Sequence, residues 1–245
     1  MIRIVLPAYN EAGNIGLLLD GIQATFADRP EDFTVLVVDD GSTDATADEV
    51  NARTGSMPVT LLKNEVNSGL SKTLKRGLVE AVRQSEDGDV IVTMDGDNTH
   101  LPGLIPRMVQ SIREGNDVVV ASRYREGSTV RGVTPFRLSL SWGAGRLFRF
   151  CYPIHGVRDY TCGYRAYRAA ILKQAFQHYG EAFIDQPGFS CMVDILLKLD
   201  KLGAIATELP FVLRYDFKMG VSKMRVAKTV RETVVLLVRR RLNLN

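Results

Sequence analysis

Five short apolar runs alternate with longer amphipathic stretches in the first 122 residues, and this alternation is the strongest constraint on the fold. Each run is continuously apolar, which is typical of strands covered on both faces. Strands that alternate with helices in this way form β-α-β units, in which the strands are parallel and the helical connections are right-handed. The sequence therefore predicts an α/β fold, with a mostly parallel sheet and helices on both faces. The expected strands are Ile2–Pro7, Phe33–Val38, Val59–Leu62, Val90–Met94 and Val118–Ala121, and the expected helices are Ala12–Ala27, Thr43–Arg53, Ser71–Gln84 and Leu101–Glu114.

The pattern loosens after residue 122, where glycines interrupt it. We expect amphipathic helices over Arg137–Phe150 and Ser222–Arg241, a further helix within Ile184–Leu202, and a strand over Ala204–Leu209. No linker divides the chain into independent domains.

The composition is that of a globular protein. The chain has 245 residues, of which 45% are hydrophobic and 24% charged, and this excludes disordered and collagen-like chains. Cys151, Cys162 and Cys191 lack metal-ligand spacing, and we interpret them as reduced thiols. No apolar run approaches the roughly 18 residues of a membrane span, and the first residues do not resemble a signal peptide. We therefore expect a cytoplasmic protein without a transmembrane span.

Positive charge is concentrated in two segments. Residues 121–150 contain six arginines and one glutamate, and residues 218–241 contain eight lysines or arginines and one glutamate. The net charge is only +3, so the rest of the chain is acidic. Such a separation is typical of a site that joins a metal to phosphates, or of a surface that faces anionic lipid.

Acidic residues follow three of the expected strands at the point where each strand ends. Glu11 follows the first, Asp39 and Asp40 follow the second, and Asp95 and Asp97 follow the fourth. Because ligands of an open parallel sheet bind beyond the carboxyl ends of the strands, we expect these carboxylates at one rim. Mg²⁺ or Mn²⁺ commonly takes one or two carboxylates together with substrate phosphates. The sequence therefore predicts a divalent-metal site at Asp95 and Asp97.

The turn after the first expected strand lacks a glycine-rich phosphate loop. It contains Tyr9-Asn10-Glu11, and no GxxxxGK[ST] motif occurs in the chain. We therefore expect metal and arginine side chains to hold phosphates. His100 follows the acidic motif, where it either supports the metal ligands or only packs in the turn.

Taken in order, the motifs resemble those of family 2 glycosyltransferases with a GT-A fold, which is a Rossmann-like, mostly parallel sheet. The later motifs resemble the branch that transfers mannose or glucose to polyprenyl (dolichyl) phosphates. The resemblance covers residues 2–224, nearly the whole chain. The matching segments are Pro7-Ala8-Tyr9-Asn10-Glu11, Asp39-Asp40-Gly41-Ser42-Thr43-Asp44, Asn67-Ser68-Gly69-Leu70, Asp95-Gly96-Asp97, Ser122-Arg123-Tyr124, residues 159–168 and Gly220-Val221-Ser222-Lys223-Met224.

This resemblance implies one GT-A domain over residues 1–224, with a nucleotide-sugar half at 1–122 and an acceptor half at 123–224. Residues 225–245 would add a basic amphipathic helix.

The resemblance also implies roles for single residues. Asp97, Arg123 and Arg137 would be catalytic. Asp95, Asp97 and Thr99 would bind Mg²⁺ or Mn²⁺, with Thr99 where the family often has Gln. Lys218 stands where the family commonly has Arg. The nucleotide sugar would contact Pro7, Tyr9, Glu11, Asp40, Asp95, Gly96, Asp97, Arg123, Lys218 and Lys223.

The implied reaction is an inverting, metal-dependent transfer of a hexose from GDP-mannose or UDP-glucose to a polyprenyl phosphate. A phosphate acceptor is already ionised at neutral pH and needs cations rather than a general base. One alternative is a family 2 transferase that acts on a sugar hydroxyl, for which Asp159 is a candidate base unless it only orients the basic loop. Another is a non-catalytic nucleotide-binding scaffold, which the intact Asp95-x-Asp97 motif argues against.

Two basic amphipathic segments, Arg137–Phe150 and residues 225–241, suit contact with a membrane surface. We expect peripheral attachment at the cytoplasmic face, directly or through a membrane-anchoring partner protein, and no nucleic-acid partner. The alternative for the terminal segment is that its apolar stripe packs on the core.

Overall fold

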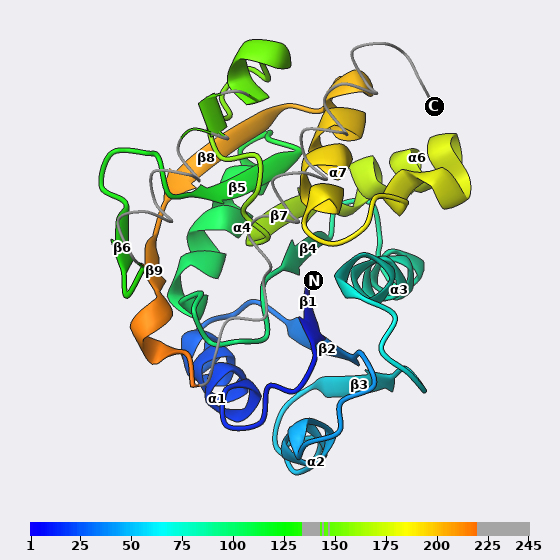
Figure 1. The fold of residues 1–245 in the computed structure, drawn as a ribbon, viewed down its shortest axis with the longest axis vertical. Coiled ribbons are helices and arrows are strands. Elements are labelled where there is room, and N and C mark those ends of the chain that lie inside the picture. Colours follow the sequence, from blue (N-terminus) through cyan, green and yellow to red (C-terminus); the bar gives the residue numbers. More distant parts are fainter. Residues whose placement is uncertain (134–142, 144, 147, 220–245) are drawn as a thin grey trace.

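The computed structural model describes residues 1–133, 143, 145–146 and 148–219. Its centre is a seven-stranded sheet in the order β3-β2-β1-β4-β7-β5-β8 (Figure 1). All neighbouring strands are parallel except those that pair with β7, which runs antiparallel to both β4 and β5. The predicted α/β fold with a mostly parallel sheet is confirmed.

The first five strands lie close to the predicted ranges. They are β1 (Ile2–Ala8), β2 (Phe33–Asp39), β3 (Val59–Lys63), β4 (Val90–Thr93) and β5 (Val118–Ser122). The strand predicted near residue 204 is β8 (Ala206–Pro210), which pairs parallel to β5. Continuous apolar runs identify these strands because both faces of the sheet are covered.

Strand β7 (Arg165–Arg168) was not predicted. It comes from the second half of the chain but lies between β4 and β5 of the first half. The two halves expected from the resemblance therefore share one sheet. Because β7 is antiparallel, its first residue lies at the edge where the parallel strands end. The loop before β7 is thereby brought to the rim where ligands of such sheets bind.

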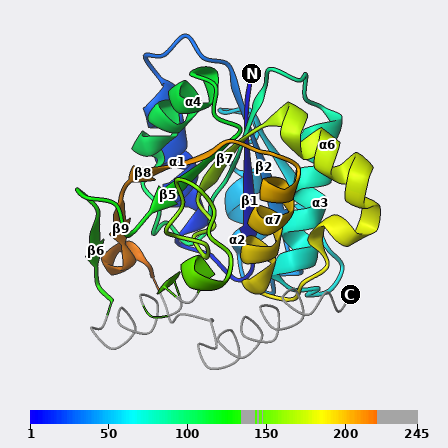
Figure 2. The ribbon, with the colours of Figure 1, turned by 90° about the horizontal axis from the view of Figure 1, so that it is seen from above.

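The helices cover both faces of the sheet. Figure 2 shows α1 (Ile15–Phe26) and α4 (Ile105–Arg113) on one side, and α3 (Leu70–Arg83), α6 (Ala169–Tyr179) and α7 (Ser190–Lys201) on the other. The remaining helical elements are α2 (Thr46–Asn51) and the 3₁₀ turns η1 (Pro102–Leu104), η2 (Gly180–Ile184) and η3 (Tyr215–Phe217).

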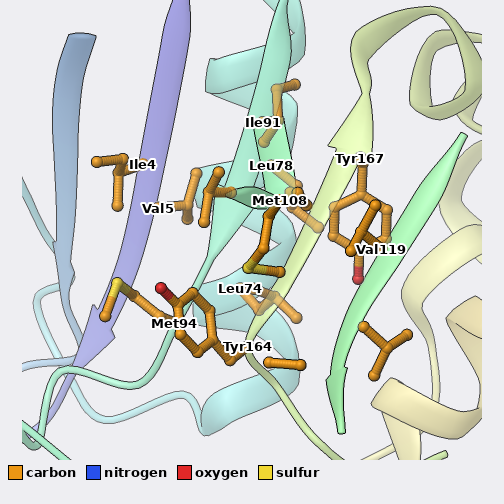
Figure 3. Packing of buried hydrophobic residues seen from close by; sticks show 14 of the residues in the cluster. Ile4, Val5, Leu74, Leu78, Ile91, Met94, Met108, Val119, Tyr164 and Tyr167 are labelled. Atoms are coloured by element: carbon orange, nitrogen blue, oxygen red, sulfur yellow. The ribbon is translucent and has the colours of Figure 1, made fainter. Parts of the chain in front are cut away.

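Helix α3 illustrates how the sequence produces this packing. Its buried residues Leu74, Leu78 and Ala81 recur at helical spacing and form one apolar face. Figure 3 shows Leu74 and Leu78 beside Val5 of β1 and the neighbouring strands. A Cβ atom at Gly77 would lie 2.5 Å from a Val5 methyl group, so only glycine allows this close approach of helix and sheet.

A second sheet pairs β6 (Thr129–Arg131) with β9 (Val212–Arg214), and it lies at one side of the main sheet (Figure 1). Leu213 forms an isolated bridge with His100, and the Arg214 amide donates to the Thr99 carbonyl at 3.0 Å. These contacts bring residues 213–219 against the loop that follows β4.

Several predictions fall on residues that the structure does not describe. These are most of Arg137–Phe150, including Arg137, and the terminal helix with Lys223. Within the described part of the chain, none of the helices has the length and apolar character needed to cross a bilayer.

Candidate active site

The loop after β4 carries the predicted metal ligands Asp95, Asp97 and Thr99. Asn98 has a positive φ of 59°, a backbone conformation that asparagine tolerates well. The resulting turn lets the Asp97 Oδ1 atom accept hydrogen bonds from the Thr99 amide at 3.2 Å and the Thr99 hydroxyl at 2.7 Å. The structure therefore brings these side chains together on one short loop, where their oxygens offer the hard ligands that Mg²⁺ and Mn²⁺ prefer.

Asp97 also forms an ion pair with Lys218, which lies 121 residues away in the sequence. The Lys218 Nζ atom lies 2.6 Å from Asp97 Oδ2, and the two side chains are 11% and 12% exposed. Burial acts to raise the pKa of Asp97, but the charges of Lys218 and His100 and the bonds from Lys218 and Thr99 outweigh it and lower that pKa. Asp97 is thus held as a carboxylate.

Asp95 lies in a different electrostatic environment, although it is only two residues away. Its pKa is raised because the surrounding protein removes water from it and because Asp97 repels its charge, against the opposing effect of His100. The His100 Nδ1 atom accepts the Asp95 amide at 3.2 Å, and His100 Nε2 lies 4.0 Å from Asp95 Oδ2. His100 therefore faces Asp95 directly while its ring stacks on Tyr164.

Gly96 lies between the two aspartates and against β1. A Cβ atom at this position would lie 3.0 Å from the Pro7 carbonyl oxygen and 3.3 Å from the Ala8 side chain. Glycine therefore lets the acidic loop pack closely on the end of β1. The half-buried Pro7 and Tyr9 lie at this same end of β1, so the structure brings the first and fourth strand ends together as predicted.

Asp40 organises the loop between β3 and α3. Its Oδ1 atom accepts hydrogen bonds at 2.8 Å from the Asn64 side chain and from the amide and hydroxyl of Ser68. Its Oδ2 atom accepts the Gly69 amide at 2.8 Å. Burial acts to raise the pKa of Asp40, but the hydrogen bonds from Ser68, Asn64 and Thr73 outweigh it and lower that pKa. Asp40 therefore holds the backbone of this loop in place.

Glu11 and Asn14 connect the end of β1 to Lys218. The Asn14 Nδ2 atom donates to Glu11 Oε2 at 2.9 Å and to the Met219 carbonyl at 3.0 Å, and the Met219 amide donates to Asn14 Oδ1 at 2.8 Å. Glu11 is 7% exposed and Asn14 1% exposed. The two bonds between Asn14 and Met219 fix the backbone next to Lys218.

Arg123 follows β5 and is held by Asp159 from the loop before β7. Its Nε and Nη2 atoms each lie 2.7 Å from an Asp159 oxygen, and Nη2 also donates to the Thr161 hydroxyl at 2.7 Å. Burial acts to lower the pKa of Arg123, but Asp159 outweighs it and raises that pKa well above its usual value. The pair fixes a guanidinium at the carboxyl edge of the sheet.

Glu208 of β8 supports the backbone that carries Asp159. Its Oε1 atom accepts the backbone amides of Arg158 and Asp159, each at 2.6 Å. Burial, with a smaller contribution from the charge of Asp159, raises the pKa of Glu208. Within the described residues, its Oε2 atom has no hydrogen-bond partner. Glu208 therefore sets the backbone that carries Asp159.

Sequence reasoning did not identify Asn14 or Glu208. Asn14 lies three residues after Glu11 in a motif already singled out, and that proximity is the signal that could have found it. Glu208 had a weaker signal, a carboxylate within an apolar strand. Within the described residues, no group of three or more His, Cys, Asp or Glu side chains forms a metal-binding cluster. Arg137 and Lys223 lie outside the described residues.

Curated relatives share most of this chain. A dolichol-phosphate mannosyltransferase of Pyrococcus furiosus is 29% identical over 232 residues, which are 94% of this chain and 61% of that protein. A polyprenol monophosphomannose synthase of Mycolicibacterium smegmatis is 31% identical over 224 residues, which are 90% of this chain and 80% of that protein. The chain thus spans about three fifths of the first relative and four fifths of the second.

Solved structures share the fold. A glucosyl-3-phosphoglycerate synthase from Mycobacterium tuberculosis, in complex with Mg²⁺ and uridine diphosphate, aligns with a TM-score of 0.69 and 21% identity over 100% of this chain and 80% of that chain. The sequence model of the family described as glycosyl transferase family 2 matches residues 3–176 of this chain. This match agrees with the motifs at the strand ends. The chain therefore belongs to glycosyl transferase family 2.

Proposed function

We propose that this protein transfers a hexose from a nucleotide sugar to a polyprenyl phosphate, with inversion at the anomeric carbon of the hexose. The observation that carries the proposal is the placement of two kinds of group at one edge of the sheet. The oxygens of Asp95, Asp97 and Thr99 follow β4, and the guanidinium of Arg123 follows β5. The names of the curated relatives support the polyprenyl phosphate acceptor.

The donor site lies between the ends of β1, β2 and β4. We assign the nucleoside to the half-buried Pro7 and Tyr9, to Glu11, and to the loop that Asp40 holds in place. Mannose from GDP-mannose is the favoured donor because the relatives are named mannosyltransferases and mannose synthases. Glucose from UDP-glucose is the other donor that the proposal admits.

The acidic loop fits a divalent metal. Asp95 and Asp97 supply carboxylate oxygens, Thr99 supplies a hydroxyl, and Mg²⁺ or Mn²⁺ commonly takes such ligands together with substrate phosphates. A bound metal would neutralise the charge that develops on the departing nucleoside diphosphate. The fixed guanidinium of Arg123 adds a preorganised positive charge at the same edge. Arg137 and Lys223 remain proposed phosphate contacts.

The acceptor phosphate needs no general base because it is a dianion near neutral pH. Asp159, the candidate base for transfer to a sugar hydroxyl, is fully buried and bonds Arg123 through both oxygens. This arrangement favours a role in positioning Arg123 over proton abstraction. It therefore favours the phosphate acceptor over the hydroxyl acceptor.

A polyprenyl acceptor also requires contact with a membrane. Phe150 is 87% exposed, and Arg146 and Arg149 beside it are exposed as well. Exposed aromatic and basic side chains in one short segment suit an interfacial contact with anionic lipid. We propose peripheral attachment at the cytoplasmic face, in which this segment and residues 225–241 take part. Binding to anionic vesicles that falls with added salt, and falls further in Phe150→Ser, would support this attachment.

The deciding experiment is a panel of radiolabelled nucleotide sugars with polyprenyl phosphate and Mn²⁺, followed by identification of the lipid product. We expect a polyprenyl phosphate hexose whose formation stops when a chelator removes the metal. Transfer to a glycan hydroxyl but not to polyprenyl phosphate would contradict the proposal.

A further inference from the structure

Both oxygens of Asp97 are already engaged. Oδ1 accepts from Thr99, and Oδ2 lies 2.6 Å from the Lys218 ammonium. The Asp97 and Lys218 side chains are largely buried, so solvent screens this pair only weakly. A divalent cation that takes Oδ2 as a ligand would compete with the ammonium for the same oxygen.

The backbone that carries Lys218 is fixed on both sides. Asn14 bonds both the amide and the carbonyl of Met219, and the Arg214 amide bonds the Thr99 carbonyl. The lysine side chain, in contrast, is a flexible four-carbon stem with a compact charge at its end. The ammonium can therefore leave Asp97 while the backbone stays in place.

We propose that Lys218 is a tethered cation that occupies Asp97 in the metal-free protein and exchanges with the incoming divalent metal. Once displaced, its ammonium turns to the diphosphate of the donor. The inference rests on the proposed function, because it takes the metal to bind at Asp97. A divalent metal at Asp97 would repel the Lys218 ammonium, because both carry positive charge, and the negatively charged diphosphate would attract it. Both interactions therefore favour movement of the ammonium from Asp97 to the diphosphate.

The test measures Mn²⁺ binding to the donor-free protein by electron paramagnetic resonance of the free ion. Lys218→Met removes the competing cation, and we expect it to bind Mn²⁺ about tenfold more tightly, since a hydrogen-bonded ion pair of this kind commonly contributes at least that much. Lys218→Arg keeps a competing cation and should bind Mn²⁺ no more tightly than the parent does. Lys201→Met, a change at an exposed lysine on α7, is the matched control.

The second measurement is the KM for the nucleotide sugar at saturating Mn²⁺. We expect Lys218→Met to raise this KM about tenfold, because one charged contact to the diphosphate is lost. Tighter metal binding with weaker donor binding is a pair of opposite effects that simple damage to the fold does not produce. Mn²⁺ binding that is equal or weaker in Lys218→Met would overturn the exchange. The metal measurement uses neither donor nor acceptor, so its result is separate from that of the transfer assay.

Discussion

Arg123 and Asp159 form a two-point ion pair in which Nε and Nη2 of the arginine each lie 2.7 Å from a different carboxylate oxygen. The Arg123 amide also donates to Asp159 Oδ2 at 3.1 Å. Asp159 thus fixes both the backbone and the side chain of Arg123. This geometry matches the planar fork of a guanidinium and not the single charge of an ammonium.

Replacing Arg123 by lysine should therefore be poorly tolerated. Lys keeps the charge but cannot satisfy both oxygens of Asp159, so the cation is no longer fixed in place. We expect kcat/KM to fall by about tenfold or more, because a cation that is not preorganised stabilises the departing diphosphate less. Steady-state kinetics with both substrates would measure the effect. Arg107→Lys, at an exposed position of α4, is the control. Parent-like kinetics in Arg123→Lys would show that transfer does not need the two-point pairing of this cation with Asp159.

Asp97→Asn should leave the fold intact and reduce transfer by about a hundredfold or more, because it removes the charge of a proposed metal ligand at a strand end. The control is Asp28→Asn, an exposed aspartate outside the site. Initial rates at increasing Mn²⁺ would check the prediction. Near-normal turnover of the variant at saturating metal would remove Asp97 from the proposed site.

The stability of the protein should depend on pH through Asp159. Burial opposes its ionisation, but Arg123 and the backbone amides outweigh burial and lower its folded pKa below the reference value of 3.8. Ionised Asp159 therefore stabilises the folded protein above pH 3.8, and this stabilisation is lost as the pH falls through the folded pKa of Asp159. At pH 7 we expect Asp159→Asn to reduce the free energy of unfolding by about 3 kcal/mol. The difference should shrink in urea titrations below about pH 4, and a constant difference would contradict the assignment.

Glu208 should behave in the opposite sense. Burial raises its folded pKa above the reference value of 4.5, so ionised Glu208 costs stability at neutral pH, and that cost disappears as the pH falls below the unfolded pKa. Glutamine keeps an oxygen for the two backbone amides and removes the charge. We expect Glu208→Gln to raise the Tm at pH 7 by about 2–4 °C, equivalent to about 1 kcal/mol.

Glu208→Ala is the comparison, because it leaves the Arg158 and Asp159 amides without their acceptor and should lower the Tm. A decrease in both variants would mean that the charge itself stabilises the fold.

The Asn14 contact should protect the peptide bond between Lys218 and Met219. Aspartate at position 14 can accept from the Met219 amide, but it cannot donate to the Met219 carbonyl and it repels Glu11. We expect trypsin to cleave after Lys218 several-fold faster in Asn14→Asp, as measured by mass spectrometry of early products. Asn51→Asp, at an exposed position of α2, is the control. Equal cleavage rates would show that Asn14 does not hold this segment.

Much of the fold could be predicted because local patterns decide it. The apolar strands β1 to β5 and the helices between them are visible in the sequence, since burial on both sides of a sheet requires continuous apolar runs. Strand β7 could not be found in this way because it begins and ends with arginine. Arg165 is fully buried and donates to the carbonyl groups of Tyr160, Cys162 and Met192 at 2.7–2.8 Å.

The sequence indicated candidate site residues one by one, but it did not indicate the pairs that they form. The strand ends and the family resemblance indicated Asp97, Lys218 and Arg123 separately. Their partners depend on contacts across 121 residues for Lys218 and 36 for Arg123. The spacing of residues along the sequence contains no information on such distant contacts. They become apparent only when the positions of β7 and β9 in the fold are known.

The position of β7 between β4 and β5 has a consequence for how the protein is made. A nascent chain that has reached residue 122 contains β4 and β5 but not the strand that joins them. Both strands then present unpaired backbone groups of the kind that promote association between chains. Strands β1 to β4 can pair without β7, but β5 can join this sheet only after residues 165–168 have left the ribosome. A fragment that ends at residue 122 should aggregate, whereas in the whole chain β7 pairs with both strands.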